Sequence, residues 1–309
     1  MVQKNSIKPE ILIICGPTAS GKTALAVECA KLLSSEVISA DSMNVYNGLN
    51  VGTAKPTKQE KKGIVHHMID VVSPFDTFSV GDYKEQAEPI LNRLINSGKI
   101  PIVCGGTGFY INSLIYDLSY GSTSGNLEVR EYYKKIAEEK GFSFVHEILK
   151  NKDAKAAETI HPNDVKRVIR ALEIFESGIK KSELNDKNEP IRPYKAYSYD
   201  IPRGELYCKI DLRVDKMIEN GLVDEVKELT DKGLTIENQC MQGIGYKEIL
   251  SYLSNGITLT EAIQKIKLNT RHYAKRQITF FKKLPELKYV KRYEDVVETA
   301  KNIVGELYD

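Results

Sequence analysis

The chain of 309 residues is poor in cysteine and contains no C-x-x-C pair. Its five cysteines are widely separated, at Cys15, Cys29, Cys104, Cys208 and Cys240. This spacing argues against both a structural zinc site and a disulfide framework. We therefore expect a protein of a reducing compartment, the cytoplasm.

Long apolar runs are also missing. No stretch reaches the ~18 consecutive apolar residues that a membrane span requires. The first ten residues, M-V-Q-K-N-S-I-K-P-E, contain no apolar signal core, so secretion is unsupported. With 41% hydrophobic and 28% charged residues, the composition is that of an ordinary globular protein. The length suits one large domain, or a core with an inserted domain and no membrane part.

A glycine-bounded loop follows the first strongly apolar segment. Residues 11–14 read I-L-I-I, typical of a strand buried on both faces, and residues 23–33 have helical spacing. Between them the phosphate-binding pattern G-x-x-x-x-G-K-[ST] is matched by Gly16, Pro17, Thr18, Ala19, Ser20, Gly21, Lys22 and Thr23. Backbone N–H groups would face one anion, Lys22 would add a charge, and the Thr23 hydroxyl could ligate Mg²⁺. A chance glycine-rich turn is the alternative, which the flanking strand and helix disfavour. The pattern predicts a polyphosphate site but not the fate of the polyphosphate.

Polar residues follow two further predicted strands. Residues 36–41 predict a strand that ends at Asp41, and residues 100–104 predict another, followed by G-G-T-G. Ligands of open α/β sheets bind beyond the carboxyl ends of strands. Asp41 is therefore a candidate general base or outer-sphere Mg²⁺ partner, with a turn or capping aspartate as the alternative. The glycines allow close approach of a ligand, and the Thr107 hydroxyl either faces that ligand or caps the next helix.

The strand predicted over residues 66–72 begins with two adjacent histidines, His66 and His67. Neighbouring residues of a strand point to opposite faces, so the two cannot easily bind one metal ion. We expect structural roles for both. Together with the other strands and the helices between them, this segment predicts an α/β fold with a parallel sheet.

The alternation of strands and helices is interrupted between residues 121 and 193. Residues 120–126 read Y-G-S-T-S-G-N, residues 127–178 show only helical patterns and turns, and residues 187–193 read K-N-E-P-I-R-P. We expect a core domain in two parts, residues 1–120 and 194–309, with an all-helical insertion over residues 121–193. A helix that begins after H-P-N-D has a basic edge of Lys166, Arg167 and Arg170, which is either merely solvated or contacts phosphates.

Two helices are predicted after the insertion, over residues 205–220 and 222–232, each ended by a glycine. Arg213 lies on the first, flanked by Asp211 and Asp215. A local ion pair is the simplest interpretation, and it contributes little stability if exposed. Residues 241–247, M-Q-G-I-G-Y-K, predict a two-glycine turn into another helix.

A basic helix is expected near the C-terminus. Residues 265–292 contain ten Lys or Arg and one acid, Glu286, so this segment carries about +9 and the remainder about −7. Over residues 261–284 the cations gather opposite an apolar face, at Lys265, Lys267, Arg271, Lys275, Arg276, Lys282 and Lys283. This pattern is typical of polyanion binding; a membrane surface is the rival, disfavoured by the mixed apolar face. Gln277 falls on the apolar side, where its amide needs partners, and a purine edge could be one.

These motifs resemble the bacterial tRNA dimethylallyltransferases along nearly the whole chain. The matching stretches are G-P-T-A-S-G-K-T at 16–23, A-D-S-M-N-V-Y at 40–46, V-G-T-A-K-P-T at 51–57, H-H-M-I-D at 66–70, G-G-T-G-F-Y at 105–110, I-H-P-N-D-V-K-R-V-I-R-A-L-E at 160–173, M-Q-G-I-G-Y-K-E at 241–248 and A-K-R-Q-I-T-F-F-K-K at 274–283. Many kinases and GTPases share the phosphate loop, but the motifs in this order are highly specific. The chain departs at Asn44, usually Gln in the family, and at Phe280, where the family has a tryptophan-containing run and this chain has no Trp at all. Neither departure argues against activity.

The resemblance implies a P-loop NTPase-like sheet and transfer of a dimethylallyl group from dimethylallyl diphosphate to tRNA. The acceptor would be the exocyclic amino nitrogen of the adenosine on the 3′ side of the anticodon. Lys22, Arg213 and Mg²⁺ on Thr23 would neutralise the departing diphosphate, while Asp41 accepts the amino proton and Thr107 assists in orientation.

The target base would be flipped out of the anticodon loop to reach the site. The residues that the resemblance assigns to the tRNA anticodon stem-loop are Asp41, Ser42, Met43, Asn44, Arg130, Lys166, Arg167, Val168, Ile169, Arg170, Gln242, Gly243, Ile244, Gly245, Tyr246, Lys247, Lys275, Arg276, Gln277, Ile278, Thr279, Phe280, Phe281 and Lys282. A monomer is expected.

Three other functions use parts of the same pattern. A small-molecule kinase would use the loop to transfer phosphate but needs no basic helix. A prenyltransferase of free adenine nucleotides would share the chemistry, although the cation cluster over residues 265–292 favours a polymeric acceptor. A non-enzymatic RNA-binding protein would keep the basic faces but has no use for Lys22 and Asp41 beside a diphosphate loop.

Overall fold

The computed structural model describes residues 10–118, 126–184, 189–292 and 295–308. The chain forms two compact units: a core of Met1–Tyr116 with Pro190–Asp309, and a helical unit of Asp117–Glu189. The boundaries fall at 117 and 189 rather than at 121 and 193. The reason is that residues 190–193 are tied to the core: the Ile191 N–H donates to the Ile115 carbonyl, and Tyr116 bridges Pro190.

The core unit is built on one six-stranded sheet whose paired neighbours all run parallel. Across the sheet the strands are β3 (His66–His67), β2 (Val37–Ser39), β4 (Ile102–Gly105), β1 (Ile11–Cys15), β5 (Tyr194–Asp200) and β6 (Leu287–Lys291). All residues of β1 are buried because the strand is central, which accounts for its uninterrupted apolar run. The predicted α/β fold with a parallel sheet is confirmed.

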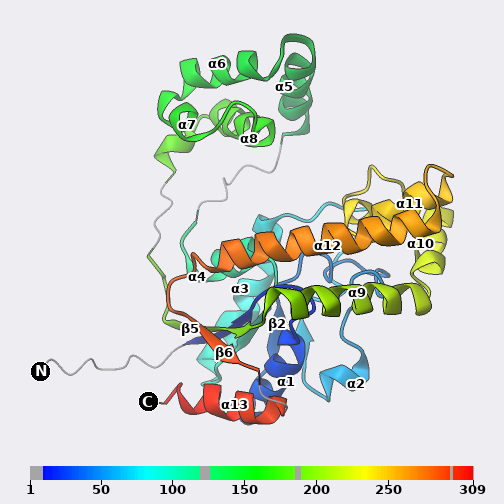
Figure 1. Ribbon diagram of the computed structural model, residues 1–309. Coiled ribbons are helices and arrows are strands. Elements are labelled where there is room, and N and C mark those ends of the chain that lie inside the picture. Colours follow the sequence, from blue (N-terminus) through cyan, green and yellow to red (C-terminus); the bar gives the residue numbers. More distant parts are fainter. Residues whose placement is uncertain (1–9, 119–125, 185–188, 293–294, 309) are drawn as a thin grey trace, which may run out of the picture. The chain divides into compact units, whose positions relative to one another are not determined.

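Helices cover the sheet and extend beyond its carboxyl edge (Figure 1). Those of the core unit are α1 (Lys22–Leu32), α2 (Lys58–Lys61), α3 (Val80–Asn96), α4 (Gly108–Ile115), α9 (Arg203–Glu219), α10 (Leu222–Asp231), α11 (Tyr246–Leu253), α12 (Leu259–Phe281) and α13 (Val296–Gly305), with a 3-10 turn η2 (Gln239–Gln242). Helices α1 and α13 pack together on an apolar cluster that includes Leu25 and Ile303. Helices α9 and α12 lie side by side, joined by Leu206, Ile210 and Ala274.

Three elements differ from the sequence-based expectation. Strand β3 comprises two residues instead of seven, because Met68 and Asp70 adopt left-handed backbone angles with φ of 60° and 56° that end the strand. Strand β6 and helix α13 were not expected. Strand β6 lies at the edge of the sheet and is largely exposed, so it lacks the apolar pattern that marks the inner strands.

The helical unit contains α5 (Leu127–Lys140), α6 (Phe142–Lys152), α7 (Ala154–Thr159), α8 (Val165–Glu176) and a 3-10 turn η1 (Lys181–Glu183). Val145, Leu149 and Leu172 are fully buried in its apolar core. Val168 and Ile169 belong to the same core, 1% and 9% exposed. Their side chains therefore pack the unit rather than face a partner, which corrects their place among the predicted tRNA contacts.

No helix in the described parts of the chain is long and apolar enough to cross a membrane. All five cysteines are free thiols. Burial raises the pKa of the Cys15, Cys29 and Cys104 thiols to about 12, so these side chains pack as small apolar groups.

Candidate diphosphate and nucleobase site

The phosphate loop joins the central strand β1 to helix α1. Gly16 and Gly21 have φ of 136° and 89°, values that favour glycine, and Gly21 stands at the N-cap of α1. Lys22 is the first residue of the helix, and its Nζ donates to the Pro17 carbonyl at 3.2 Å. The glycines of the motif thus permit the tight turn that directs Lys22 and the N-terminus of α1 to one place.

Gln277 of α12 fastens this loop to the turn after β4. Its Oε1 accepts the Thr18 N–H at 2.9 Å, and its Nε2 donates to the Gly106 carbonyl at 2.9 Å. The side chain is 5% exposed. Gln277 was correctly placed on the buried face, but its amide bonds the protein backbone where we had suggested a purine edge.

Asp41 and Thr107 lie at the carboxyl ends of neighbouring strands, as predicted. The Thr107 Oγ1 accepts the Ser42 N–H at 3.0 Å, and the Asp41 Oδ1 accepts the Met43 N–H at 2.9 Å. Thr107 occupies the N-cap position of α4, yet its side chain makes no capping hydrogen bond. The Thr107 hydroxyl therefore accepts a hydrogen bond from the backbone next to Asp41 and does not cap helix α4.

The glycines at 105, 106 and 108 make close contacts within the protein. A Cβ on Gly105 would lie 2.0 Å from the Ala40 carbonyl oxygen, and one on Gly106 would lie 2.1 Å from the Gln277 Nε2. A Cβ on Gly108 would strike the Phe280 ring at 2.0 Å. The glycines were expected to allow a ligand to approach the backbone closely. In the structure, the groups that approach them are the end of β2 and helix α12.

Arg213 of α9 lies in the same region and forms no ion pair with a carboxylate of the described residues. Its neighbours Asp211 and Asp215 bind α12 instead, Asp211 to Arg271 and Asp215 to Lys267 at 2.6 Å. The local ion pair considered for Arg213 is therefore absent from the described ion pairs. The Arg213 Nη2 donates to the Thr53 carbonyl at 3.5 Å, and its Nε is buried with no hydrogen-bond partner.

The two cations of the site are desolvated. Burial lowers the pKa of the Lys22 ammonium, while the nearby Cys104 and Asp41 act in the opposite direction. Burial likewise lowers the pKa of the Arg213 guanidinium, opposed by the charges of Asp41 and Glu60. Two desolvated cations in a cleft favour the binding of an anion, which would restore the lost solvation.

Two adjoining cavities meet at these residues. The smaller, about 60 Å³, is lined by Lys22, Thr23 and Asn44 among others. The larger, about 350 Å³, has walls from the end of β2, the turn before α11 and the middle of α12. Four residues line both, namely Thr18, Asp41, Thr53 and Arg213. Asp41 therefore stands where a group in one cavity would meet a group in the other.

The residues predicted to contact tRNA separate into those that line the larger cavity and those that do not. Ser42, Met43, Gln242, Gly243, Ile244, Tyr246, Lys247, Arg276 and Gln277 line the larger cavity. Asn44 lines only the smaller one. Lys275, Thr279 and Lys282 are exposed along α12 and just beyond it. Phe281 and Gly245 are buried, Ile278 packs on the α9–α12 core, and Phe280 stacks edge-on with Phe109.

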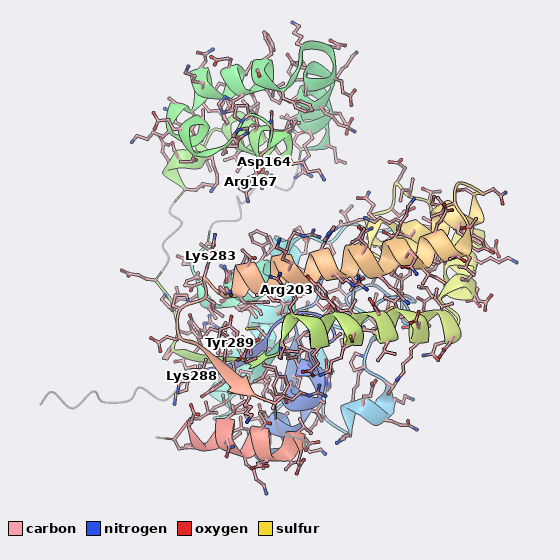
Figure 2. All side chains as sticks on the ribbon, in the orientation of Figure 1. Asp164, Arg167, Arg203, Lys283, Lys288 and Tyr289 are labelled. Atoms are coloured by element: carbon pink, nitrogen blue, oxygen red, sulfur yellow. The ribbon has the colours of Figure 1, made fainter. Side chains whose placement is uncertain are left out.

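The basic residues of the helical unit differ in their surroundings. Arg130 Nε and Arg170 Nη1 contact the buried carboxylate of Glu173 at 3.0 and 2.8 Å. Arg167 is 73% exposed and pairs with Asp164 at the start of α8 (Figure 2). Lys166 is also exposed. Lys166 and Arg167 are thus presented to a partner, whereas Arg130 and Arg170 first hold the unit together.

The fit of a metal ion rests on Thr23. Its hydroxyl has no hydrogen bond to any other described residue and borders the smaller cavity with Asp41. No group of three or more His, Cys, Asp or Glu side chains in the described residues could hold a metal. One hydroxyl beside a cavity fits Mg²⁺, which keeps several waters and takes further oxygens from a phosphate ligand.

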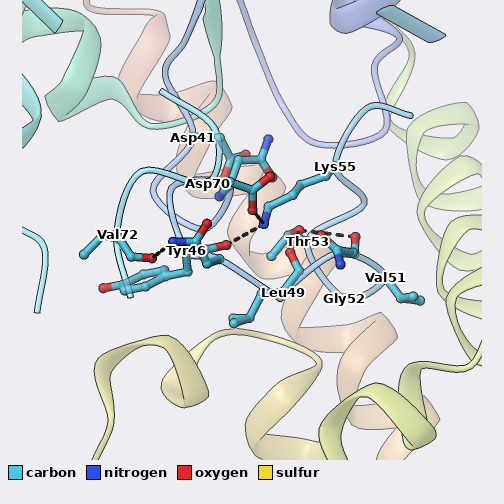
Figure 3. A network of polar contacts seen from close by, with 12 residues as sticks. Asp41, Tyr46, Leu49, Val51, Gly52, Thr53, Lys55, Asp70 and Val72 are labelled. Carbon is cyan, nitrogen blue, oxygen red and sulfur yellow. Dashed lines mark hydrogen bonds and ion pairs between the residues drawn. The ribbon is translucent and has the colours of Figure 1, made fainter. Parts of the chain in front are cut away.

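Glu225, Lys55 and the segment 49–56 were missed as site residues. The Lys55 Nζ bonds the Tyr46 carbonyl and the Asp70 carboxylate (Figure 3). Thr53 and Pro56 line the smaller cavity. The sequence signal was the V-G-T-A-K-P-T stretch, which had been matched but given no role. The His66 Nδ1 bonds the Ile64 carbonyl, and the His66 side chain lines the smaller cavity. The His67 Nε2 bonds Glu36, and the structural roles expected for both histidines stay predictions.

The parallel sheet, the glycine-bounded loop and the paired cavities define an α/β protein of the phosphate-binding-loop class. A family described as IPP transferase matches residues 44–284, and one described as isopentenyl transferase matches residues 9–73. The chain belongs to the IPP transferase family. The family predicted from the sequence motifs is thus confirmed.

Named relatives cover nearly the whole chain. A tRNA dimethylallyltransferase of Acetivibrio thermocellus is 46% identical over 288 residues, 92% of each chain. The solved tRNA isopentenylpyrophosphate transferase of Bacillus halodurans is 39% identical with a TM-score of 0.72, covering 97% of both chains. A eukaryotic dimethylallyltransferase acting on tRNA is 30% identical with a TM-score of 0.80, covering 91% of this chain and 73% of its own.

Proposed function

We infer that this chain is a tRNA dimethylallyltransferase that transfers a dimethylallyl group from dimethylallyl diphosphate to an adenosine of tRNA. The acceptor atom is the exocyclic amino nitrogen of the adenosine on the 3′ side of the anticodon. One observation carries the inference: Asp41 lies between a small cavity with two desolvated cations and a larger cavity suited to an organic ring.

The smaller cavity is the proposed diphosphate site. In the reaction the bond between the allylic carbon and the diphosphate oxygen breaks, and the electron pair leaves with the diphosphate. Lys22, Arg213 and the loop amides oppose the charge that develops on that oxygen. Mg²⁺ bound through Thr23 would add Lewis-acid stabilisation of the same charge.

The larger cavity is the proposed site of the flipped adenine. Its volume of about 350 Å³ lies within the ~300–1,000 Å³ typical of small-molecule sites. The adenine amino group is a weak nucleophile, so its proton must leave as the new N–C bond forms. The Asp41 carboxylate accepts that proton, and Thr107 holds the backbone beside Asp41 through its bond to the Ser42 N–H.

The tRNA would be held by the cations around the mouth of this cavity and by the helical unit. Lys275 and Arg276 on α12, Lys247 in the first turn of α11, and Lys166 with Arg167 on α8 are exposed and available to phosphates. Phosphate contacts of this kind position the RNA without reading its sequence. We propose that the protein acts as a monomer.

The test replaces Asp41 by Asn and measures transfer of labelled dimethylallyl from its diphosphate to unmodified tRNA, followed by nucleoside analysis. The Asp41→Asn variant should lose at least ~10²-fold in kcat, because general-base catalysis contributes about 10²–10⁴-fold. Affinities for tRNA and diphosphate should stay within about twofold, since the side chain keeps its size. Asp231→Asn, at an exposed position at the end of α10, serves as the matched control.

Two outcomes would contradict the proposal. Full turnover by Asp41→Asn removes Asp41 as the base. If the unaltered protein leaves tRNA unprenylated but phosphorylates a metabolite with ATP, the kinase alternative takes its place. Prenylation of free AMP or ADP in preference to tRNA would identify the nucleotide prenyltransferase.

A further inference from the structure

A single carboxylate on α10 holds the loop that separates the two cavities. The Glu225 Oε2 accepts the N–H groups of Asn50 and Val51, each at 2.8 Å. Its Oε1 accepts the Gly52 N–H at 3.0 Å and the Tyr246 hydroxyl at 2.7 Å. Both oxygens are thus fully used by donors from two segments that are distant in the sequence.

The first segment, residues 49–56, forms a wall of the site. Thr53, Ala54 and Pro56 border the smaller cavity, and Gly52 and Thr53 border the larger. The Thr53 carbonyl is also the acceptor of the Arg213 Nη2. The loop is braced at its far end by Lys55 and internally by the Thr53 hydroxyl, which donates to the Leu49 carbonyl at 2.7 Å (Figure 3).

The second segment is the start of α11 with the turn before it, which belongs to the nucleobase side. Tyr246 is fully buried, and a Cβ on Gly52 would lie 2.6 Å from its ring. Burial raises the pKa of the Tyr246 hydroxyl, with the Glu225 charge acting in the same direction, so this group remains a donor. Gly243, Ile244 and Lys247, next to Tyr246, line the larger cavity.

We propose that Glu225 is a positioning residue for the transfer reaction, fixing the wall at residues 50–53 relative to the turn and first helical residues at 243–247. Through the Thr53 carbonyl it holds Arg213 where the diphosphate of the donor binds, and through Tyr246 it holds the rim of the nucleobase cavity. Glu225 lines neither cavity, so in this proposal it acts through Thr53 and Tyr246 without contacting a substrate. This assignment rests on the proposed function for the identity of the two ligands.

The test uses Glu225→Gln, which keeps the shape but has one acceptor oxygen. The amide nitrogen of Gln would face backbone N–H donors or the Tyr246 hydroxyl, so some of the four hydrogen bonds to this side chain would be lost. We expect the dissociation constant of inorganic pyrophosphate, measured calorimetrically with Mg²⁺, to rise about tenfold, equivalent to about 1.4 kcal/mol. The KM for dimethylallyl diphosphate should rise in parallel, with kcat changed about threefold or less. Tyr246→Phe, which removes one donor and leaves three, should give a smaller rise of the same kind.

Glu228→Gln is the control, since Glu228 is exposed on the same helix. Unchanged pyrophosphate affinity in a folded Glu225→Gln variant would overturn the assignment. A loss of kcat with unaltered KM and pyrophosphate affinity would do so as well, because it indicates only a smaller folded fraction. If Glu225→Gln fails to fold, Tyr246→Phe decides, and an unchanged pyrophosphate affinity there overturns the assignment. Pyrophosphate binding is measured without tRNA. Weaker binding by Glu225→Gln would therefore support the positioning role of Glu225 even if the unaltered protein does not prenylate tRNA.

Discussion

Two pairs of cations in this chain, Arg130 with Arg170 and Lys22 with Arg213, have different surroundings. In the helical unit, Arg130 and Arg170 contact Glu173, whose side chain is 1% exposed. In the core unit, Lys22 and Arg213 border the smaller cavity, and neither has an ion pair with any described carboxylate. Both arginines of the first pair thus have a carboxylate partner within the protein, although they share it. The second pair has only the nearby charge of Asp41 and no ion pair with a described residue, and a bound anion would supply direct partners.

Helix α12 also carries both paired and unpaired cations, and the two kinds lie in different parts of the helix. Lys267 and Arg271 pair with Asp215 and Asp211 of α9, and so join the two helices. Lys275, one to two turns further on, is exposed and has no ion pair with a described residue. A basic helix face is therefore a polyanion surface only where acids of a neighbouring helix leave it free.

Removing the unpaired cation of the phosphate loop tests the core side of this comparison. Lys22→Ala should lower kcat/KM for the donor about 10³-fold, because a preorganised charge on a leaving group is worth about 10²–10³-fold or more. Steady-state transfer to an anticodon stem-loop measures it, with tRNA affinity unchanged. Lys31→Ala, on the exposed side of α1, is the control. A loss below tenfold would show that the diphosphate departs elsewhere.

Removing the shared carboxylate tests the helical unit. Glu173 also accepts the Asn126 N–H at 2.6 Å, so Glu173→Gln disturbs three contacts and removes the charge that both arginines contact. We expect the unit to lose about 3 kcal/mol, as is typical of broken buried pairs. Amide hydrogen exchange in α5 and α8 should accelerate about 10²-fold. Glu131→Gln, 69% exposed, is the control; unchanged protection would mean that the pairs are dispensable.

Glu36 of the core unit is a paired carboxylate whose contribution to stability should depend on pH. Hydrogen bonds from His67, with Arg93 and Lys99, lower the pKa of Glu36 to about 2 from its ordinary 4.5. A depressed pKa stabilises the fold above about pH 4.5, and this contribution is lost as the pH falls from 4.5 to 2. Glu36→Gln should therefore cost about 2 kcal/mol near pH 7 and less than half of that near pH 3. Urea unfolding measures the difference, with Glu85→Gln as control; a cost independent of pH would contradict the assignment.

The smallest effect concerns the exposed cations of α12. Lys275→Ala combined with Arg276→Ala should weaken tRNA binding and reduce the slope of log affinity against log salt by about 1.4, or about 0.7 for each lost phosphate contact. Filter binding at several salt concentrations measures the slope. Lys232→Ala with Lys301→Ala removes the same charge at exposed positions outside the candidate site. Equal slopes for both double variants would leave α12 without a specific role in tRNA binding.

Local patterns in the chain determined its family, its phosphate loop and most of its core. The apolar run of residues 11–14, the spacing of Gly16, Gly21 and Lys22, and the strand ending at Asp41 each depend on neighbours in the sequence. Side-chain periodicity and glycine conformation are local properties, so the sequence alone reveals them. The edge strand β6 was missed because an exposed edge carries little such periodicity.

Only the tertiary structure decided which charges are paired. Arg213 stands beside two aspartates in the sequence, yet both bind α12, some sixty residues away, and leave Arg213 to the cavity. Glu225 meets the backbone of residues 50–52, more than 170 residues before it. Hydrogen bonds and ion pairs depend on distances across the fold, and side chains adjacent in sequence on a helix point in different directions. The partners of a charged group are therefore determined by how the helices pack.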